Sequence, residues 1–159
     1  MILYHGSNVE VATPRILVSD RKLDFGTGFY LTSSRSQAER WAQLTTARRK
    51  TGQPIITTYE FFEEDLAQLK TLVFEKPDVN WLKYTANNRR NSDASDDYDL
   101  VVGPVANDRT APVIAFYYAG FYDEAETIRR LLPQKLRDQY AFKTDRALAC
   151  ITLREVIHL

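Results

Sequence analysis

The sequence predicts an α+β fold. Runs rich in β-branched and aromatic residues, of which residues 54–62 are the clearest, indicate core strands, and helical patterns separate several of them. These strands do not alternate regularly with helices, as a doubly wound parallel sheet requires. The chain has 159 residues, of which 44% are hydrophobic. A chain of this size can bury a sizeable core, so a single domain over residues 1–159 is expected.

The first half of the chain is predicted to hold short strands and one long helix. Ser33 or Ser34 can cap this helix, and Gly52 is expected to end it. The predicted elements are strands over residues 2–5, 29–32, 54–62 and 69–74 and a helix over residues 34–50.

The second half is predicted to alternate less regularly between helix and strand. Asp78 is expected to cap a helix, Pro133 to stop a later one, and the polar segment 91–97 to be a loop. The predicted elements are helices over residues 78–90, 111–119 and 123–132 and strands over residues 98–102, 139–142 and 151–157.

Charge and composition favour a cytoplasmic protein without a membrane partner. The 21 basic and 21 acidic residues give no net charge that would steer the whole chain to nucleic acid or membrane. One cysteine cannot form an internal disulfide, which fits a reducing compartment. No signal peptide and no apolar run of membrane-spanning length is expected. No cluster of cysteine and histidine indicates a metal site.

Two short motifs near the start carry the chemistry. The sequence Tyr-His-Gly-Ser at residues 4–7 ends a predicted strand, and a glycine-rich turn at residues 26–28 leads into Phe29 and Tyr30. A histidine after an apolar strand is more often structural than catalytic. Gly6, however, would let a ligand approach the backbone, where an N–H and a C=O could pair with a planar amide.

The order of these motifs resembles the poly(ADP-ribose) polymerase and diphtheria-toxin type of ADP-ribosyltransferase. The whole chain also resembles a family of bacterial proteins grouped with these transferases, through residues 5–7, 24–32, 37–42, 98–106 and 139–144. The resemblance implies a split, mixed β-sheet core with peripheral helices, and NAD as a co-substrate that releases nicotinamide. It implies that His5 holds the adenosine-side ribose and Gly6 the carboxamide, with Ser7 and Gly28 among the NAD-binding residues.

The resemblance also assigns the nicotinamide ring to Tyr30 and Trp41. The polymerases carry a second tyrosine eleven residues after the first, and Trp41 stands at that offset from Tyr30. Two aromatic faces would each stabilise the flat cationic ring by about 1 kcal/mol. The alternative is that Trp41 only anchors its helix to the core. The serine that contacts the carboxamide in the polymerases is replaced by Ala38, which leaves that contact to Gly6 and to a water or Ser36.

The late strand departs from the pattern of the transferases, because Gln139 stands where they carry a catalytic glutamate. Cleavage of the glycosidic bond builds positive charge on the ribose. At about 5 Å and an effective dielectric near 20, the missing attraction is about 3 kcal/mol, or roughly two decades of rate. Three interpretations stay open: an active His-Tyr-Gln variant, which we favour, a chain that binds NAD without turnover, or another acid, namely Glu155, Asp138 or Asp108.

Several other polar residues have a less specific signal for a role in ligand binding. Asp24 precedes the glycine turn and could orient a ligand or the turn itself. Arginine forks match phosphate oxygens, so Arg89 beside Asn88, or Arg109 in the segment 107–109, could reach an NAD phosphate. The resemblance implies a macromolecular acceptor for ADP-ribose, and protein, nucleic acid and water all stay open. Bacterial relatives of this chemistry suggest a toxin with a small antitoxin partner by analogy. The rival hypotheses are a non-catalytic NAD or ADP-ribose binding module and an interaction protein that binds no NAD.

Overall fold

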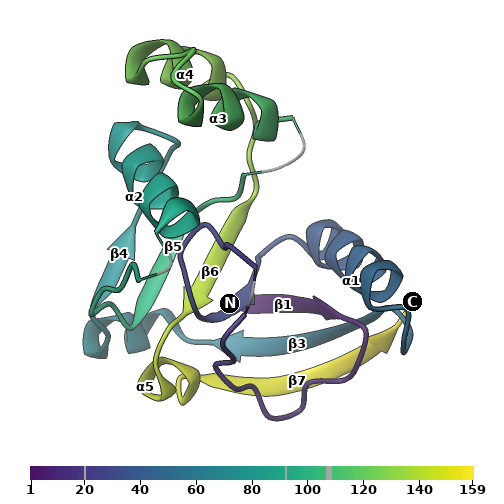
Figure 1. Ribbon diagram of the computed structural model, residues 1–159. Helices are drawn as coiled ribbons and strands as arrows, with labels where there is room; N and C mark the ends of the chain where they lie inside the picture. The colour runs from purple at the N-terminus through teal and green to yellow at the C-terminus, as the bar shows by residue number, and fades with distance from the viewer. Residues whose placement is uncertain (20, 92, 107–108) are drawn as a thin grey trace.

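The chain folds into two β-sheets with helices packed around them, which confirms the α+β class (Figure 1). The computed structural model describes residues 1–19, 21–91, 93–106 and 109–159. The first sheet is antiparallel and has the strand order β1-β3-β7, with β1 at Ile2–Ser7, β3 at Ile55–Phe61 and β7 at Ile151–His158. Its outer strand β7 forms a β-bulge opposite Thr58 and Tyr59.

The second sheet is mixed and has the strand order β2-β6-β5-β4. Its members are β2 (Phe29–Leu31), β6 (Asp138–Phe142), β5 (Leu100–Pro104) and β4 (Thr71–Val73). The β4–β5 pair is parallel and the other two pairs are antiparallel. An isolated bridge between Tyr4 and Thr32 joins β1 to the end of β2 and so links the two sheets.

The helices divide between the two sheets, as Figure 1 shows. Helix α1 packs on β1, while α2, α3 and α4 gather beside the mixed sheet. Their bounds, with those of the 3-10 helix η1, are α1 Arg35–Arg49, η1 Glu63–Gln68, α2 Val79–Arg90, α3 Ala111–Tyr118, α4 Glu124–Leu131 and α5 Asp145–Leu148. Among the described residues, no helix combines the length and the apolar character needed to cross a membrane.

Helix ends follow the capping signals of the sequence with one exception. The side chains of Ser34 and Asp78 accept hydrogen bonds from the first turns of α1 and α2, as predicted. The end of α1 differs from the prediction, because Lys50 and not Gly52 is the C-cap. Lys50 adopts the left-handed conformation with φ of 56° while its N–H donates to the carbonyl of Thr46.

Two apolar clusters fill the core. The first lies between the sheets and includes Leu3, Phe29, Tyr59 and Phe142. The second is formed by the mixed sheet and the helices beside it, and includes Phe25, Trp81 and Ile114. Phe29 and Tyr30 are neighbours on β2 that pack against different clusters, since successive side chains of a strand point to opposite faces.

Candidate functional site

The candidate site begins at a split between β1 and β2. Met1 and Phe61 exchange two backbone hydrogen bonds of 2.6 and 2.9 Å, so the alternate residues Leu3 and His5 also direct their backbone polar groups to β3. Tyr4 exchanges bonds of 2.8 and 3.0 Å with Thr32 on the other side. By the same alternation, Gly6 directs its N–H and C=O toward β2, beyond the point at which the two strands stop pairing.

His5 connects the two sides of this split. Its Nδ1 lies 2.9 Å from the carbonyl oxygen of Tyr30, and its ring stacks on Phe29 with centroids 4.4 Å apart. Because a carbonyl only accepts hydrogen bonds, Nδ1 carries the proton, and in the neutral ring Nε2 is then an acceptor. Burial lowers the pKa of His5, the bond to Tyr30 opposes this, and the charge of Arg49 lowers the pKa further. The neutral form is therefore favoured.

Gly6 lets α1 approach the strand closely. A Cβ at this position would overlap the carbonyl oxygen of Ala38 and lie 2.8 Å from the backbone nitrogen of Ala42. Only glycine is compatible with this contact. The packing therefore fixes α1, and with it Trp41, beside the strand that carries His5. Ser7 follows on β1 and is buried.

Tyr30 closes the glycine-rich turn with its own hydroxyl. The hydroxyl donates to the carbonyl of Gly26 at 2.7 Å and accepts from the backbone N–H of Phe25 at 3.1 Å. Burial, with a contribution from the charge of Asp24, raises the pKa of Tyr30 far above its usual value, so the hydroxyl stays protonated. Within the described part of the chain, no ring pair includes Tyr30 or Trp41, and Trp41 is partly buried.

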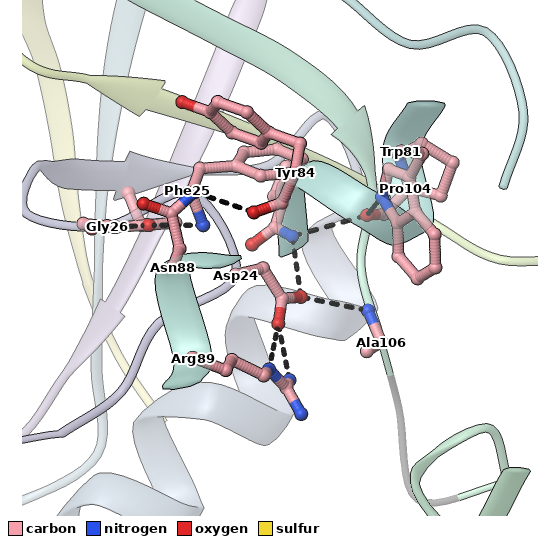
Figure 2. Close-up of polar contacts among 11 residues, drawn as sticks. Asp24, Phe25, Gly26, Trp81, Tyr84, Asn88, Arg89, Pro104 and Ala106 are labelled. Atoms are coloured by element: carbon pink, nitrogen blue, oxygen red, sulfur yellow. Dashed lines mark hydrogen bonds and ion pairs between the residues drawn. The ribbon is translucent and has the colours of Figure 1, made fainter. Parts of the chain in front are cut away.

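Gln139 lies on β6, and its side chain bonds to the buried carboxylate of Asp24. Figure 2 shows Asp24 with its partners Arg89 and Ala106, and Pro104. The amide nitrogen of Gln139 donates to Oδ2 of Asp24 at 2.9 Å and to the carbonyl of Pro104 at 3.2 Å. Asp24 also accepts from Nε of Arg89 at 2.6 Å and from the N–H of Ala106 at 3.1 Å. The junction joins the turn before β2, the helix α2, the segment after β5 and the strand β6. Both of the hydrogen bonds that the amide nitrogen of Gln139 donates are therefore used within the fold.

Lys143 is a second polar anchor for the same turn. Its ammonium group donates to the carbonyl of Phe25 at 2.8 Å and to Oδ2 of Asp96 at 2.6 Å, and it lies 3.3 Å from the hydroxyl of Tyr84. The side chains of Lys143 and Asp96 are only 10% and 15% exposed. Burial and then the hydrogen bond to Asp96 raise the pKa of Tyr84. Phe25 and Gly26, at the start of the turn that precedes Tyr30, are thus held by both Tyr30 and Lys143.

The structure brings together only part of the predicted site. His5, Gly6 and the backbone carbonyl of Tyr30 meet at the split. The ring of Tyr30 packs against the second cluster, and the side chain of Gln139 faces Asp24. Gly28 packs against β6, since a Cβ there would lie 3.0 Å from the carbonyl oxygen of Phe142. Arg89 is paired with Asp24, and the amide of Asn88 donates to the carbonyl of Tyr84.

Two of the alternative acids, Asp138 and Glu155, lie within the described residues. Asp138 accepts from Thr32 and from the N–H of Ser33, at 3.0 and 2.8 Å. Glu155 is exposed on β7. Asp108, with the rest of the segment 107–108, lies outside the described residues. No described group of His, Cys, Asp and Glu side chains could hold a metal ion.

Two cavities lie elsewhere on the surface. A groove of about 640 Å³ on the face of the antiparallel sheet is lined by Tyr4, Arg35 and residues of β7, and a cavity of about 320 Å³ adjoins Cys150. None of the residues predicted to bind NAD lines either cavity.

Sequence reasoning missed Lys143 and the partners of Gln139. Residue spacing carries no signal for these contacts, because 115 residues separate Gln139 from Asp24 and 118 separate Lys143 from Phe25. The only hint is compositional: Asp24 precedes a turn, and a buried carboxylate requires donors.

The family model described as "Protein of unknown function (DUF3990)" matches residues 1–153 of the chain. No curated protein and no solved structure matches it.

Proposed function

We propose that this chain, which belongs to the DUF3990 family, is an NAD-dependent ADP-ribosyltransferase with an ADP-ribosyltransferase-like core. In this proposal NAD binds at the split between β1 and β2. His5 and Gly6 bind it, Trp41 and Tyr30 flank the nicotinamide, and the ADP-ribose passes to a macromolecular acceptor.

The observation that carries the proposal is the orientation of His5. Its bond to the carbonyl of Tyr30 places the proton on Nδ1, and burial keeps the ring neutral by lowering its pKa. Nε2 is then an acceptor, suited to a ribose hydroxyl that donates to it. A structural histidine can have the same tautomer and the same lowered pKa, so loss of NAD binding on removal of the ring is what separates the two roles.

The backbone of Gly6 supports the placement of nicotinamide. In a continuous antiparallel ladder, Gly6 would face Tyr30, since Tyr4 faces Thr32. The carbonyl of Tyr30 instead accepts from the ring of His5. The N–H and C=O of Gly6 therefore point toward the split, and a carboxamide offers the complementary C=O and N–H.

The reaction breaks the bond between the ribose C1′ and the nicotinamide nitrogen, and the electron pair leaves with nicotinamide. The acceptor forms the new bond to C1′ and releases its proton to solvent. Tyr30 is not the base, because its hydroxyl stays protonated and is bonded to Gly26. Gln139 supplies no negative charge, so the chemistry is expected to be slow, by roughly two decades relative to a site with a carboxylate about 5 Å from the ribose.

The acceptor is proposed to be a protein or a nucleic acid, and a small antitoxin is the natural partner if the activity is toxic. This part rests on analogy with bacterial transferases of the same type. It fits a chain whose net charge is zero and which therefore lacks a global field favouring either acceptor.

A non-catalytic NAD-binding module is the second candidate function. The observation that favours it is the engagement of Gln139, whose amide nitrogen is used by Asp24 and Pro104. In that case the split binds NAD, or ADP-ribose, and no residue on β6 assists cleavage.

The test is label transfer from adenylate-labelled NAD into cell lysate, with His5→Ala as the site variant. His158→Ala is the matched control, because His158 is the other histidine of the chain and is exposed near its end. The transferase predicts label with wild type and with His158→Ala and none with His5→Ala. Protease or nuclease sensitivity then identifies the acceptor class. If NAD binds but no label is transferred, the non-catalytic NAD-binding module is supported. If NAD neither binds nor transfers label, both proposed functions are overturned.

A further inference from the structure

Strand β7 is an outer strand of the antiparallel sheet, and its edge away from β3 pairs with no described strand. The β3 residues Ile56, Thr58 and Glu60 face it, because the alternate residues of β3 bond to β1. Their partners on β7 are Ile157, Glu155 and Thr152, which therefore turn their backbone groups inward. The residues of β7 that turn their N–H and C=O outward are Ile151, Leu153, Val156 and His158.

The β-bulge places the centre of this pattern between two residues of β7. Two residues of β3, Thr58 and Tyr59, span Leu153 to Glu155 on β7, so Arg154 is the inserted residue. In an uninterrupted strand, residues 153 and 156 would have opposite orientations. With the insertion, the outward positions are 151, 153, 156 and 158, which read the same in both directions about a centre between Arg154 and Glu155.

Side chains follow the same symmetry. Leu153 and Val156 are the register partners of Tyr59 and Thr57, and Glu155 is the partner of Thr58. Leu153, Arg154 and Glu155 all line the groove. Leu153 is 42% exposed, so an apolar side chain remains uncovered at this edge. An antiparallel second copy would set Leu153 opposite Val156 and Ile151 opposite His158.

The charges are complementary under the same operation. Arg154 of one copy would face Glu155 of the other, and this happens twice across the axis. Within one chain, Arg154 contacts Glu60 at 3.1 Å with both side chains partly exposed. Charges and bulges normally protect a sheet edge from pairing. Here the adjacent opposite charges at Arg154 and Glu155 would be complementary to those of an antiparallel second copy.

We propose that two copies of this chain associate through β7, antiparallel and about a twofold axis between Arg154 and Glu155. The two antiparallel sheets then form one continuous sheet, and the outward N–H and C=O groups pair across the axis. This interface does not depend on the NAD site, which lies at the opposite edge of the same sheet.

The test uses charge reversal and measures dissociation by analytical ultracentrifugation. Arg154→Glu and Glu155→Arg should each raise the dimer dissociation constant by about 10- to 100-fold, since each places like charges opposite one another twice. An equimolar mixture of these two variants should recover the dimer as a heterodimer, and so should the double variant carrying both changes.

The mixture separates association from folding, because Arg154→Glu also loses the contact with Glu60 and this loss persists in the mixture. Circular dichroism of each variant confirms that it folds. A wild-type chain that is monomeric at about 100 μM, or variants that dimerise as well alone as when mixed, would overturn the proposal.

Discussion

The amide nitrogen of Gln139 lies 2.9 Å from Oδ2 of Asp24, and both side chains are buried. A glutamate in place of Gln139 would set two carboxylates against each other. The glutamine is therefore explained by its partner: Asp24 needs a donor from β6, and a carboxylate has none unless it is protonated. The structure thus gives Gln139 a role as a hydrogen-bond donor to Asp24.

Gln139→Glu is expected to destabilise the fold by about 3 kcal/mol at pH 7, because it replaces a hydrogen bond with a buried like-charge contact. The neighbouring Asp24 would raise the pKa of the new carboxyl. The penalty is largest above that pKa and shrinks as the pH falls and the carboxyl takes up a proton. Urea unfolding at pH 7 and pH 5 measures this.

Gln37→Glu is the matched control for that change. Gln37 is also a buried glutamine, but its amide nitrogen donates to the carbonyl of Asp138 at 2.9 Å and to the hydroxyl of Thr32 at 3.3 Å. Gln37→Glu is expected to lower the free energy of unfolding by less than Gln139→Glu does, and this effect should depend less on pH. If Gln139→Glu is as stable as wild type and gains label transfer, Gln139 is a catalytic position and not a structural one.

Gly6→Ala tests the contact between β1 and α1. The added methyl overlaps the carbonyl oxygen of Ala38, and backbone atoms cannot yield as a flexible side chain can. A loss of about 3 kcal/mol in the free energy of unfolding is expected. Gly120→Ala serves as the comparison, since its φ of 80° is unfavourable but nothing lies within 4 Å of a Cβ. It should cost about 1 kcal/mol. If Gly6→Ala and Gly120→Ala lower the free energy of unfolding equally, the close contact between Gly6 and α1 is contradicted.

NAD affinity should depend on pH through His5. Burial lowers the pKa of His5 below its ordinary value of about 6.5. Binding should be constant from about pH 8 to pH 6.5 and should fall as the imidazole takes up a proton, because Nε2 then becomes a donor. Stability follows the same direction: the unfolded chain binds the proton first, so stability is present above about pH 6.5 and is lost as the pH falls through the lowered pKa. Fluorescence titration of NAD across this range is the measurement, and affinity that rises on acidification would contradict it.

Lys143→Met should release the turn before β2. The substitution removes the cation that pairs with the carboxylate of Asp96 and the donor to the carbonyl of Phe25 in a nearly buried setting, at a cost of about 3 kcal/mol. Asp96 keeps the hydrogen bond from the hydroxyl of Tyr84. Lys70→Met is the control, since the Lys70–Asp97 pair is exposed and its loss should change stability little. Chemical denaturation compares the two. Amide exchange should rise at residues 25–28 only in the first variant.

The sequence was sufficient for elements whose signals are local. Ser34 and Asp78 accept capping hydrogen bonds as predicted, and the β-branched run of β3 forms a central strand. The predicted end of α1 near residue 50 is correct, but Lys50 and not Gly52 takes the left-handed position that glycine usually fills. The short helices η1 and α5 were not predicted, since four to six residues give too little periodicity.

The candidate site was predicted less completely than the fold. His5 and Gly6 were identified because a histidine followed by glycine at a strand end is a local pattern. The junction of Gln139, Asp24 and Arg89 joins segments that lie far apart in the sequence, so neither its geometry nor the role of Gln139 could be derived from spacing. The resemblance to transferases supplied a position for Gln139 but not its hydrogen-bond partner.

The most direct test of the account is isothermal titration of the protein with NAD at pH 7.5, for wild type, His5→Ala and His158→Ala. NAD should bind wild type and His158→Ala alike, while His5→Ala should weaken binding by about tenfold or more through loss of the acceptor Nε2. Equal affinity in all three proteins, or no binding to a folded wild type, would contradict the assignment of the split between β1 and β2 as an NAD site.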